Sequence, residues 1–158
     1  MSIDPDTFRS VLGRFASGVT VVTACDAEGH DHGMTVSAFC SLSLEPPLVL
    51  VCIDRTASMF PALGTATAFA VNILSHSQEA LSRRFAADEP DRFAGVGYSR
   101  GQGGCVLLDD VLAHLECSIV RQLDAGDHTI VIGEVETAEA QSERPLLYYR
   151  GGYAQLER

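Results

Sequence analysis

The chain has 158 residues, enough for one domain with a continuous core, and 46% hydrophobic with 20% charged residues is an ordinary globular composition. Its net charge of −10, without lysine or a basic cluster, argues against a nucleic-acid partner, because the phosphates would be repelled. No signal peptide or membrane span is expected, and five cysteines without a CxxC motif predict free thiols in a reducing cytoplasm.

Local signals divide the chain into seven or so strands and two or three helices. Runs of β-branched and apolar residues predict strands, and apolar residues at helical spacing predict helices. In chain order we expect a helix over 5–16, strands over 18–25, 33–37 and 47–54, a short helix over 56–63, a strand over 69–74, a helix over 75–86, a loop over 87–104, and strands over 111–123, 128–138, 146–150 and 153–156. This pattern favours a mostly antiparallel barrel or sandwich over a parallel sheet.

A few residues set the expected ends of these elements. Asp4 followed by Pro5 is a typical helix start, with a side-chain acceptor and a preset φ angle. Ser75 or Ser77 is expected to cap the helix over 75–86. The dipeptides Ala125-Gly126 and Gly151-Gly152 predict hairpin turns.

Common nucleotide-binding motifs are missing from the sequence. The glycine-rich stretch 95–104 contains no GxGxxG, and a lysine-free chain cannot form a P-loop. His30 and His32 flank Asp31 in a turn, but no further ligand is spaced to complete a metal site. No metal is therefore expected.

The segment from His32 to Asp54 carries the chemistry that the sequence suggests. It places hydroxyls among apolar and small residues, at Thr35, Ser37, Ser41 and Ser43, with Gly33 and Ala38 nearby. A flat ligand with an apolar end and a polar edge, such as an isoalloxazine ring, needs a surface of this kind. From composition alone, the alternative that these hydroxyls simply face solvent is preferred.

The same segment resembles the short-chain flavin reductase family, the reductase components of two-component flavin-dependent monooxygenases. The resemblance covers nearly the whole chain and keeps its motifs in order. It rests on FRSVLGRFASGVTVVTA (8–24), the segment 32–54, FAVNILSHSQEALSRRFA (69–86), DRFAG (91–95), GDHTIVIGEVE (126–136) and PLLYYRGGY (145–153).

The resemblance implies a fold, ligands and partners. The fold would be mainly β, an antiparallel Greek-key split β-barrel of the FMN-binding type with a few short helices, forming one domain over residues 1–158. The chain would be a homodimer that binds FMN or FAD near the subunit interface. NADH or NADPH would reduce the flavin by hydride transfer, and a separate oxygenase would receive the product.

The resemblance also assigns residues to roles. His128 would orient the nicotinamide, and Tyr153 would cover its pocket, although a histidine bonded to Asp127 and a core or interface tyrosine are open alternatives. Asp54 is interpreted as a cap or turn residue rather than a catalytic acid. The flavin-binding set is completed by Thr35, Val36, Ser37, Ala38, Ser41, Leu42, Arg55, Thr56, Ser58, Arg84 and Phe85, of which Arg55, Thr56, Ser58 and Arg84 would serve the phosphate.

Three other functions remain compatible with the sequence. A flavin- or haem-binding carrier or sensor could use the same barrel without turnover, and a ferric reductase could use the same flavin step. An oxidase of a phosphorylated small molecule would need more basic residues than this chain offers. Fold alone does not decide between them.

Overall fold

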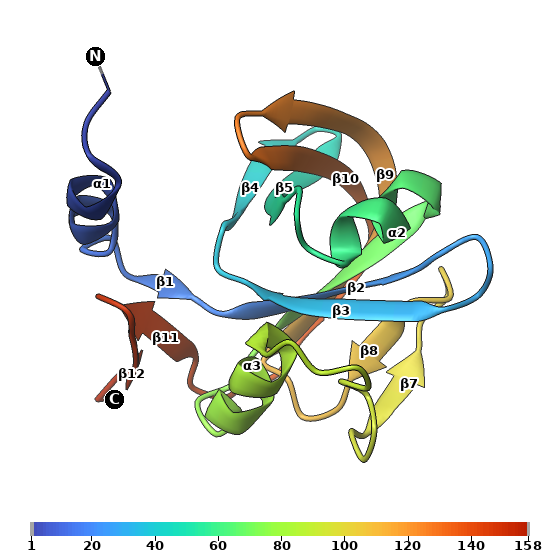
Figure 1. The fold of residues 1–158 in the computed structure, drawn as a ribbon. Helices are drawn as coiled ribbons and strands as arrows, with labels where there is room; N and C mark the ends of the chain where they lie inside the picture. Colours follow the sequence, from blue (N-terminus) through green and yellow to red (C-terminus); the bar gives the residue numbers. More distant parts are fainter. Residues whose placement is uncertain (1, 158) are drawn as a thin grey trace.

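The computed structural model describes residues 2–157 as a mainly antiparallel β structure with three short helices (Figure 1). The helices are α1 (Pro5–Leu12), α2 (Met59–Thr65) and α3 (Glu79–Ala86). The strands are β1 (Ser17–Gly18), β2 (Thr20–Cys25), β3 (Asp31–Val36), β4 (Phe39–Leu44), β5 (Pro47–Asp54), β6 (Ala68–Ile73), β7 (Tyr98–Arg100), β8 (Val106–Leu108), β9 (Ala113–Ala125), β10 (His128–Ala140), β11 (Leu146–Tyr149) and β12 (Gly152–Gln155).

Seven strands form one curled sheet in the order β3-β2-β6-β9-β10-β5-β4, and every neighbouring pair is antiparallel. Within residues 2–157 no ladder joins the two edge strands, β3 and β4, so the barrel stays split there. The edge strands are consecutive in the chain, and only Ser37 and Ala38 link them. The prediction of an antiparallel split barrel is confirmed.

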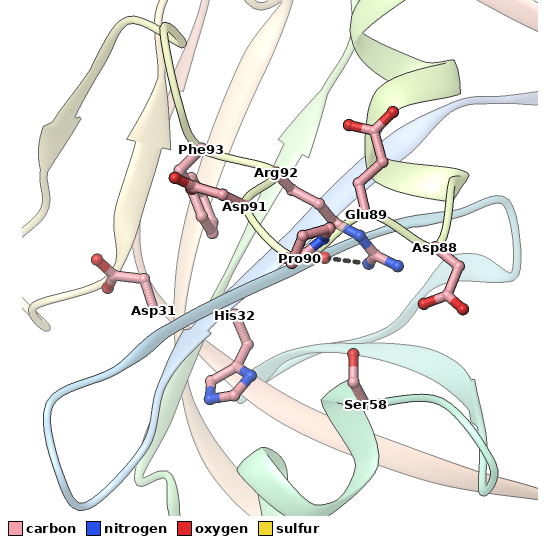
Figure 2. A pocket seen from close by; sticks show the side chains of 10 residues that line it. Asp31, His32, Ser58, Asp88, Glu89, Pro90, Asp91, Arg92 and Phe93 are labelled. Atoms are coloured by element: carbon pink, nitrogen blue, oxygen red, sulfur yellow. Dashed lines mark hydrogen bonds between the residues drawn. The ribbon is translucent and has the colours of Figure 1, made fainter.

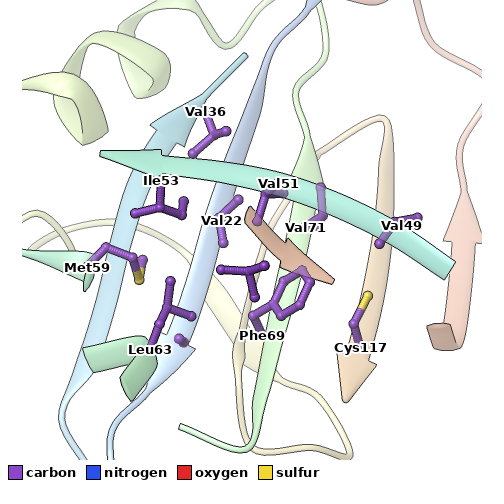
Figure 3. Close-up of a cluster of buried hydrophobic side chains, with 12 residues drawn as sticks. Val22, Val36, Val49, Val51, Ile53, Met59, Leu63, Phe69, Val71 and Cys117 are labelled. Carbon is purple, nitrogen blue, oxygen red and sulfur yellow. The ribbon is translucent and has the colours of Figure 1, made fainter. Parts of the chain in front are cut away.

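Buried side chains from six strands and α2 fill the inside of the curled sheet (Figure 3). Met59 and Leu63 of α2 are almost fully buried, so this helix closes the core between β2, β3 and β5. Phe69 of β6 lies at the centre with an exposed fraction of 0%. Opposite it, β10 carries Gly133, where a Cβ atom would come within 2.5 Å of the Phe69 ring. Only glycine fits this position without displacing the core.

A second cluster covers the other face of β2 and β6. It joins residues of α3, β8 and β11 to the barrel, and its members are Val19, Val21, Leu74, Phe85, Val106, Leu108, Val111 and Leu146. The buried amide of Asn72 spans the two layers, since it donates to the carbonyl of Val21 and accepts from the backbone N–H of Leu108. This layer fixes α3 beside β3, where the candidate site lies.

The expected N-terminal helix is shorter than predicted, and its apolar face is uncovered. Asp4 caps α1 as predicted, accepting from the backbone N–H groups of Asp6 and Thr7, but the helix ends at Leu12 instead of residue 16. No residue of α1 is buried, and Phe8 is 53% exposed. In Figure 1 the helix stands apart from the barrel. The helical spacing of its apolar residues therefore does not reflect packing within one chain.

Several predicted ends are wrong by a few residues. The helix over 75–86 begins only at Glu79, and Gln78, not a serine, precedes it. Ser75 instead lies two residues after the end of β6 and forms an isolated β-bridge with Pro145. The two hairpin turns each lie one residue from the expected place, at Gly126-Asp127 and at Arg150-Gly151. Both Arg150 and Gly151 have positive φ angles.

Three strands were not predicted. The strand β4 was missed because FCSLSL lacks a run of β-branched residues, and it forms by pairing with β5. The strand β7 lies inside the stretch 87–104 that was expected to be one loop. The strand β8 follows that stretch and pairs with β7. The predicted short helix starts at Met59, three residues later than expected.

All five cysteines are free, as predicted from the sequence. Cys105 and Cys117 are buried, and this burial raises their pKa values to about 11 and about 12. Cys40 is exposed on the edge strand β4. Among the described residues, no helix combines the length and the apolar character needed to cross a bilayer.

Candidate active site

The end of β3 forms a small hydroxyl-lined cavity with α3 and β12. Thr35, Ser37, Ser82 and Tyr153 line it, and its volume is about 190 Å³. The Thr35 hydroxyl donates to the carbonyl of Ser82 at 2.6 Å, so this side chain is already engaged in holding β3 against α3. Ser37 and Ala38, the link between the two edge strands, are exposed beside it. Of the hydroxyl residues that the sequence groups together, Thr35 and Ser37 line this cavity, whereas Ser41 and Ser43 lie on β4.

The role expected of Gly33 is different in the structure. The sequence suggested that its missing side chain would let a ligand approach the backbone. A Cβ atom on Gly33 would instead lie 2.8 Å from the ring of Phe85 and 3.0 Å from the ring of Phe93. Gly33 is buried, and two aromatic rings occupy the space. This glycine allows α3 and the following segment to pack on β3.

The turn after β5 holds three of the predicted phosphate-site residues. Asp54 accepts from both the backbone N–H and the hydroxyl of Thr56, at 2.8 and 2.7 Å, and these bonds lower the pKa of Asp54. This confirms the interpretation of Asp54 as a turn residue. Arg55 reaches toward the β9–β10 turn, where its guanidinium lies 3.7 Å from Asp124. Ser58 precedes α2 and makes no side-chain cap bond, which leaves its hydroxyl available.

His128 lies at the same end of the sheet as this turn. It is the first residue of β10 and the ladder partner of Asp54 on β5. Its Nδ1 atom is 2.7 Å from a carboxylate oxygen of Asp127, and its side chain is 42% exposed. On the other side of β5, the N–H of Cys52 donates to the carbonyl of Ala38. β5 thus lies between His128 on one side and the exposed Ser37-Ala38 link on the other.

A larger cavity of about 470 Å³ opens between β3, the start of α2 and the segment after α3 (Figure 2). Arg92 crosses it and donates to the carbonyl of Gly33 at 2.7 Å. His32 and Ser58 face it from the other side. His32 is 2.9 Å from Asp26, and this hydrogen bond is the main cause that lowers the pKa of Asp26 to about 2. The cavity is acidic overall, with Asp88, Glu89 and Asp91 on its rim.

Three predicted site residues are committed to other contacts. Arg84 donates to the carbonyls of Arg92, Asp91 and Ala94, so its guanidinium holds the segment after α3. Phe85 has an exposed fraction of 0%, and Val36 is 5% exposed and belongs to the barrel core. The side chains of Val36 and Phe85 therefore do not line a ligand site.

The two predicted residues on β4 lie on the open edge of the sheet. Ser41 is exposed, and Leu42 is 47% exposed. Ser41 pairs with Val49 of β5, whereas a register shift between Ser41 and Ser43 leaves Leu42 out of the ladder. They lie across the split from β3, so one chain places them beside the opening without covering it.

These residues fit a flavin only in part within one chain. Ligand pockets usually measure roughly 300 to 1,000 Å³. The cavity at Thr35 is smaller, at about 190 Å³, while the one at Arg92 falls within the range, at about 470 Å³. The exposed link, the hydroxyls and the imidazole suit a planar ring with a polar edge. One chain supplies one wall of such a site.

Two residues that organise this region were not predicted. Ser82 is fully buried between β3 and β12, and Arg92 crosses the larger cavity. Ser82 could have been suspected because a serine interrupts the apolar face of α3, between Leu81 and Phe85. Arg92 lies inside the DRF motif, which marked the segment but not the side chain.

Comparison with known proteins identifies the sequence pattern. Residues 12–157 match the model of the flavin reductase like domain. The chain is 41% identical to a Rhodococcus jostii protein named "Flavin-dependent monooxygenase, reductase subunit HsaB", over 99% of this chain and 80% of that one. It is 45% identical to a Rhizobium meliloti protein named "Probable flavin reductase", over 95% of this chain. In that match, this chain spans about half of the relative's own length, 48%.

A solved structure shares the fold. The Streptomyces globisporus NADH:FAD oxidoreductase, in complex with NAD and FAD fragments, superposes with a TM-score of 0.92. The two are 38% identical, and the match covers 99% of this chain and 96% of the other. The split barrel and the arrangement of motifs along the chain are therefore common to both.

Proposed function

Because this chain belongs to the flavin reductase family, we propose that it is an NAD(P)H-dependent oxidoreductase that reduces FMN or FAD. The observation that carries the proposal is the exposed Ser37-Ala38 link, which lies between the hydroxyl-lined end of β3 and the imidazole of His128. The solved relative in complex with NAD and FAD fragments supports the choice of ligands.

The residues of this chain would bind and align the reactants. A bound flavin supplies the redox chemistry by accepting hydride from the nicotinamide. The backbone from Thr35 to Ala38 would lie along the ring, with Ser41 and Leu42 beside it. Arg55 and Ser58 would bind the phosphate, since the Ser58 hydroxyl makes no cap bond, whereas Thr56 already donates to Asp54. His128 and Tyr153 would orient the nicotinamide, since hydride transfer depends on close approach and alignment.

Reduced flavin would pass to a separate oxygenase. The relative named as the reductase subunit of a flavin-dependent monooxygenase supports this partner. The open split of the barrel also supports it, because a ligand held against one wall can leave. The five free cysteines support a location in a reducing cytoplasm.

The second wall of the site would come from another copy of the chain, in a homodimer. Apolar side chains just after α1 and at the end of β4 support this, because Phe15 is 83% and Leu44 is 91% exposed. We expect Phe15→Asp and Leu44→Asp together to convert a dimer into monomers in sedimentation velocity, while circular dichroism keeps its β signal. A wild-type chain that sediments as a monomer at all concentrations would refute the dimer.

A steady-state assay tests the activity. The purified protein is mixed with NADH or NADPH and with FMN, FAD or riboflavin, and nicotinamide absorbance is followed. We expect oxidation that requires both the protein and the flavin, with a clear preference among the flavins. Protein that binds flavin but leaves NADH and NADPH unoxidised would indicate a carrier, and absence of both binding and oxidation would end the proposal.

A further inference from the structure

Ser82 lies in the middle of α3 with an exposed fraction of 0%. A buried hydroxyl is costly unless it is hydrogen-bonded, so its partners indicate what it is for. The helix itself does not need it, since serine is not a strong helix former. An alanine here would serve the helix better.

Ser82 joins two walls of the small cavity through two contacts. Its hydroxyl is 2.7 Å from the hydroxyl of Tyr153 on β12. Its carbonyl accepts the hydroxyl of Thr35 on β3 at 2.6 Å. Both partners line the cavity together with Ser82. One residue of α3 therefore fixes the distance between the end of β3 and the ring of Tyr153.

The ring of Tyr153 is held on its other sides as well. The guanidinium of Arg83 lies over it, 4.9 Å from the ring centroid, and Glu79 holds that guanidinium at 2.8 Å. The ring of Tyr148 meets it edge to face, with centroids 5.5 Å apart. These contacts restrain the plane of the ring, whereas the Ser82 bond restrains its hydroxyl end. Without that bond the ring could tilt about the remaining contacts.

We infer that Ser82 is a positioning residue that sets the orientation of Tyr153 at the edge of the nicotinamide site. The inference rests on the proposed function, in which Tyr153 covers that site. Ser82 does not touch the reactants, because it is fully buried. Its effect is therefore expected in the binding of NAD(P)H rather than in the maximal rate.

The test compares Ser82→Ala, Tyr153→Phe and the double variant. We expect Ser82→Ala to raise KM for NADH about fivefold, the effect of about one lost hydrogen bond, while kcat changes less than twofold. The double variant is expected to match the larger single effect, because both substitutions remove the same bond. Thr23→Val is the matched control, since it removes a buried hydroxyl that donates to the carbonyl of Val106 at 2.6 Å, away from the cavity.

The control separates positioning from stability. Thr23→Val is expected to lower Tm as Ser82→Ala does but to leave KM within twofold of wild type. A KM shift of equal size in Thr23→Val, or additive effects in the double variant, would overturn the inference. If Ser82→Ala does not fold, Tyr153→Phe decides, because unchanged KM in that variant also overturns it. A wild-type protein without flavin-dependent NADH oxidation would instead refute the proposed function.

Discussion

Replacing Gly133 with alanine is expected to lower the free energy of unfolding by about 3 kcal/mol, at the upper end of the cost of overpacking a core. The new Cβ atom would lie 2.5 Å from Cζ of Phe69 and 2.7 Å from Cβ of Cys117. Both side chains are almost fully buried, so neither has free space to move into. Urea unfolding followed by far-ultraviolet circular dichroism measures the change.

Two further variants show whether the close contact is the cause. Phe69→Leu removes the nearest ring atoms, so Gly133→Ala is expected to cost less in that background than in wild type. Gly64→Ala is the matched control, because no atom lies within 4 Å of its Cβ position on α2. It is expected to stabilise the helix by up to about 1 kcal/mol. Wild-type stability of Gly133→Ala would contradict the register of β9 and β10.

Replacing His128 with alanine is expected to lower kcat/KM for NADH on the order of tenfold to a hundredfold, the range in which lost alignment slows a reaction. The imidazole is fixed at the start of β10 by Asp127 and lies opposite Asp54. Only β5 separates its strand from the Ser37-Ala38 link. Affinity for flavin, measured by quenching of flavin fluorescence, is expected to change little.

His30→Ala is the control for this substitution. His30 is 69% exposed in the turn between β2 and β3, so its loss is expected to leave kcat/KM within twofold. Asp127→Ala removes the bond that fixes the imidazole and is expected to cost less than His128→Ala. Full activity of His128→Ala would show that the ring only bonds Asp127 at the start of β10, which is the alternative that the sequence left open.

Elements with strong local signals were predictable from the sequence. The strand over 47–54 matches β5 at both ends, because a continuous apolar run is bounded by prolines and a turn. The expected start of a strand at His128 is also confirmed. β4 could not be found in this way, because its pairing with β5 decides its conformation. The helix over 75–86 was predicted four residues too early, because Ser75 pairs with Pro145 across the chain.

The site was predictable in its segments but not in its contacts. Motifs located the end of β3, the turn after β5 and the start of β10, and the structure pairs the last two directly. Which side chains face one another depends on tertiary packing. Gly33, expected to face a ligand, lies under Phe85, and Arg84 binds carbonyls of the following segment. No local pattern encodes such distances.

The buried thiols have a chemical consequence for a protein that handles reduced flavin. Thiolates, not thiols, react with peroxides and other electrophiles. With pKa values of about 11 and about 12, Cys105 and Cys117 remain protonated at neutral pH. Oxygen that meets free reduced flavin yields hydrogen peroxide, so an enzyme of this kind works beside an oxidant. Because they stay protonated, these core thiols react more slowly with that oxidant than thiolates would, which favours the survival of the barrel.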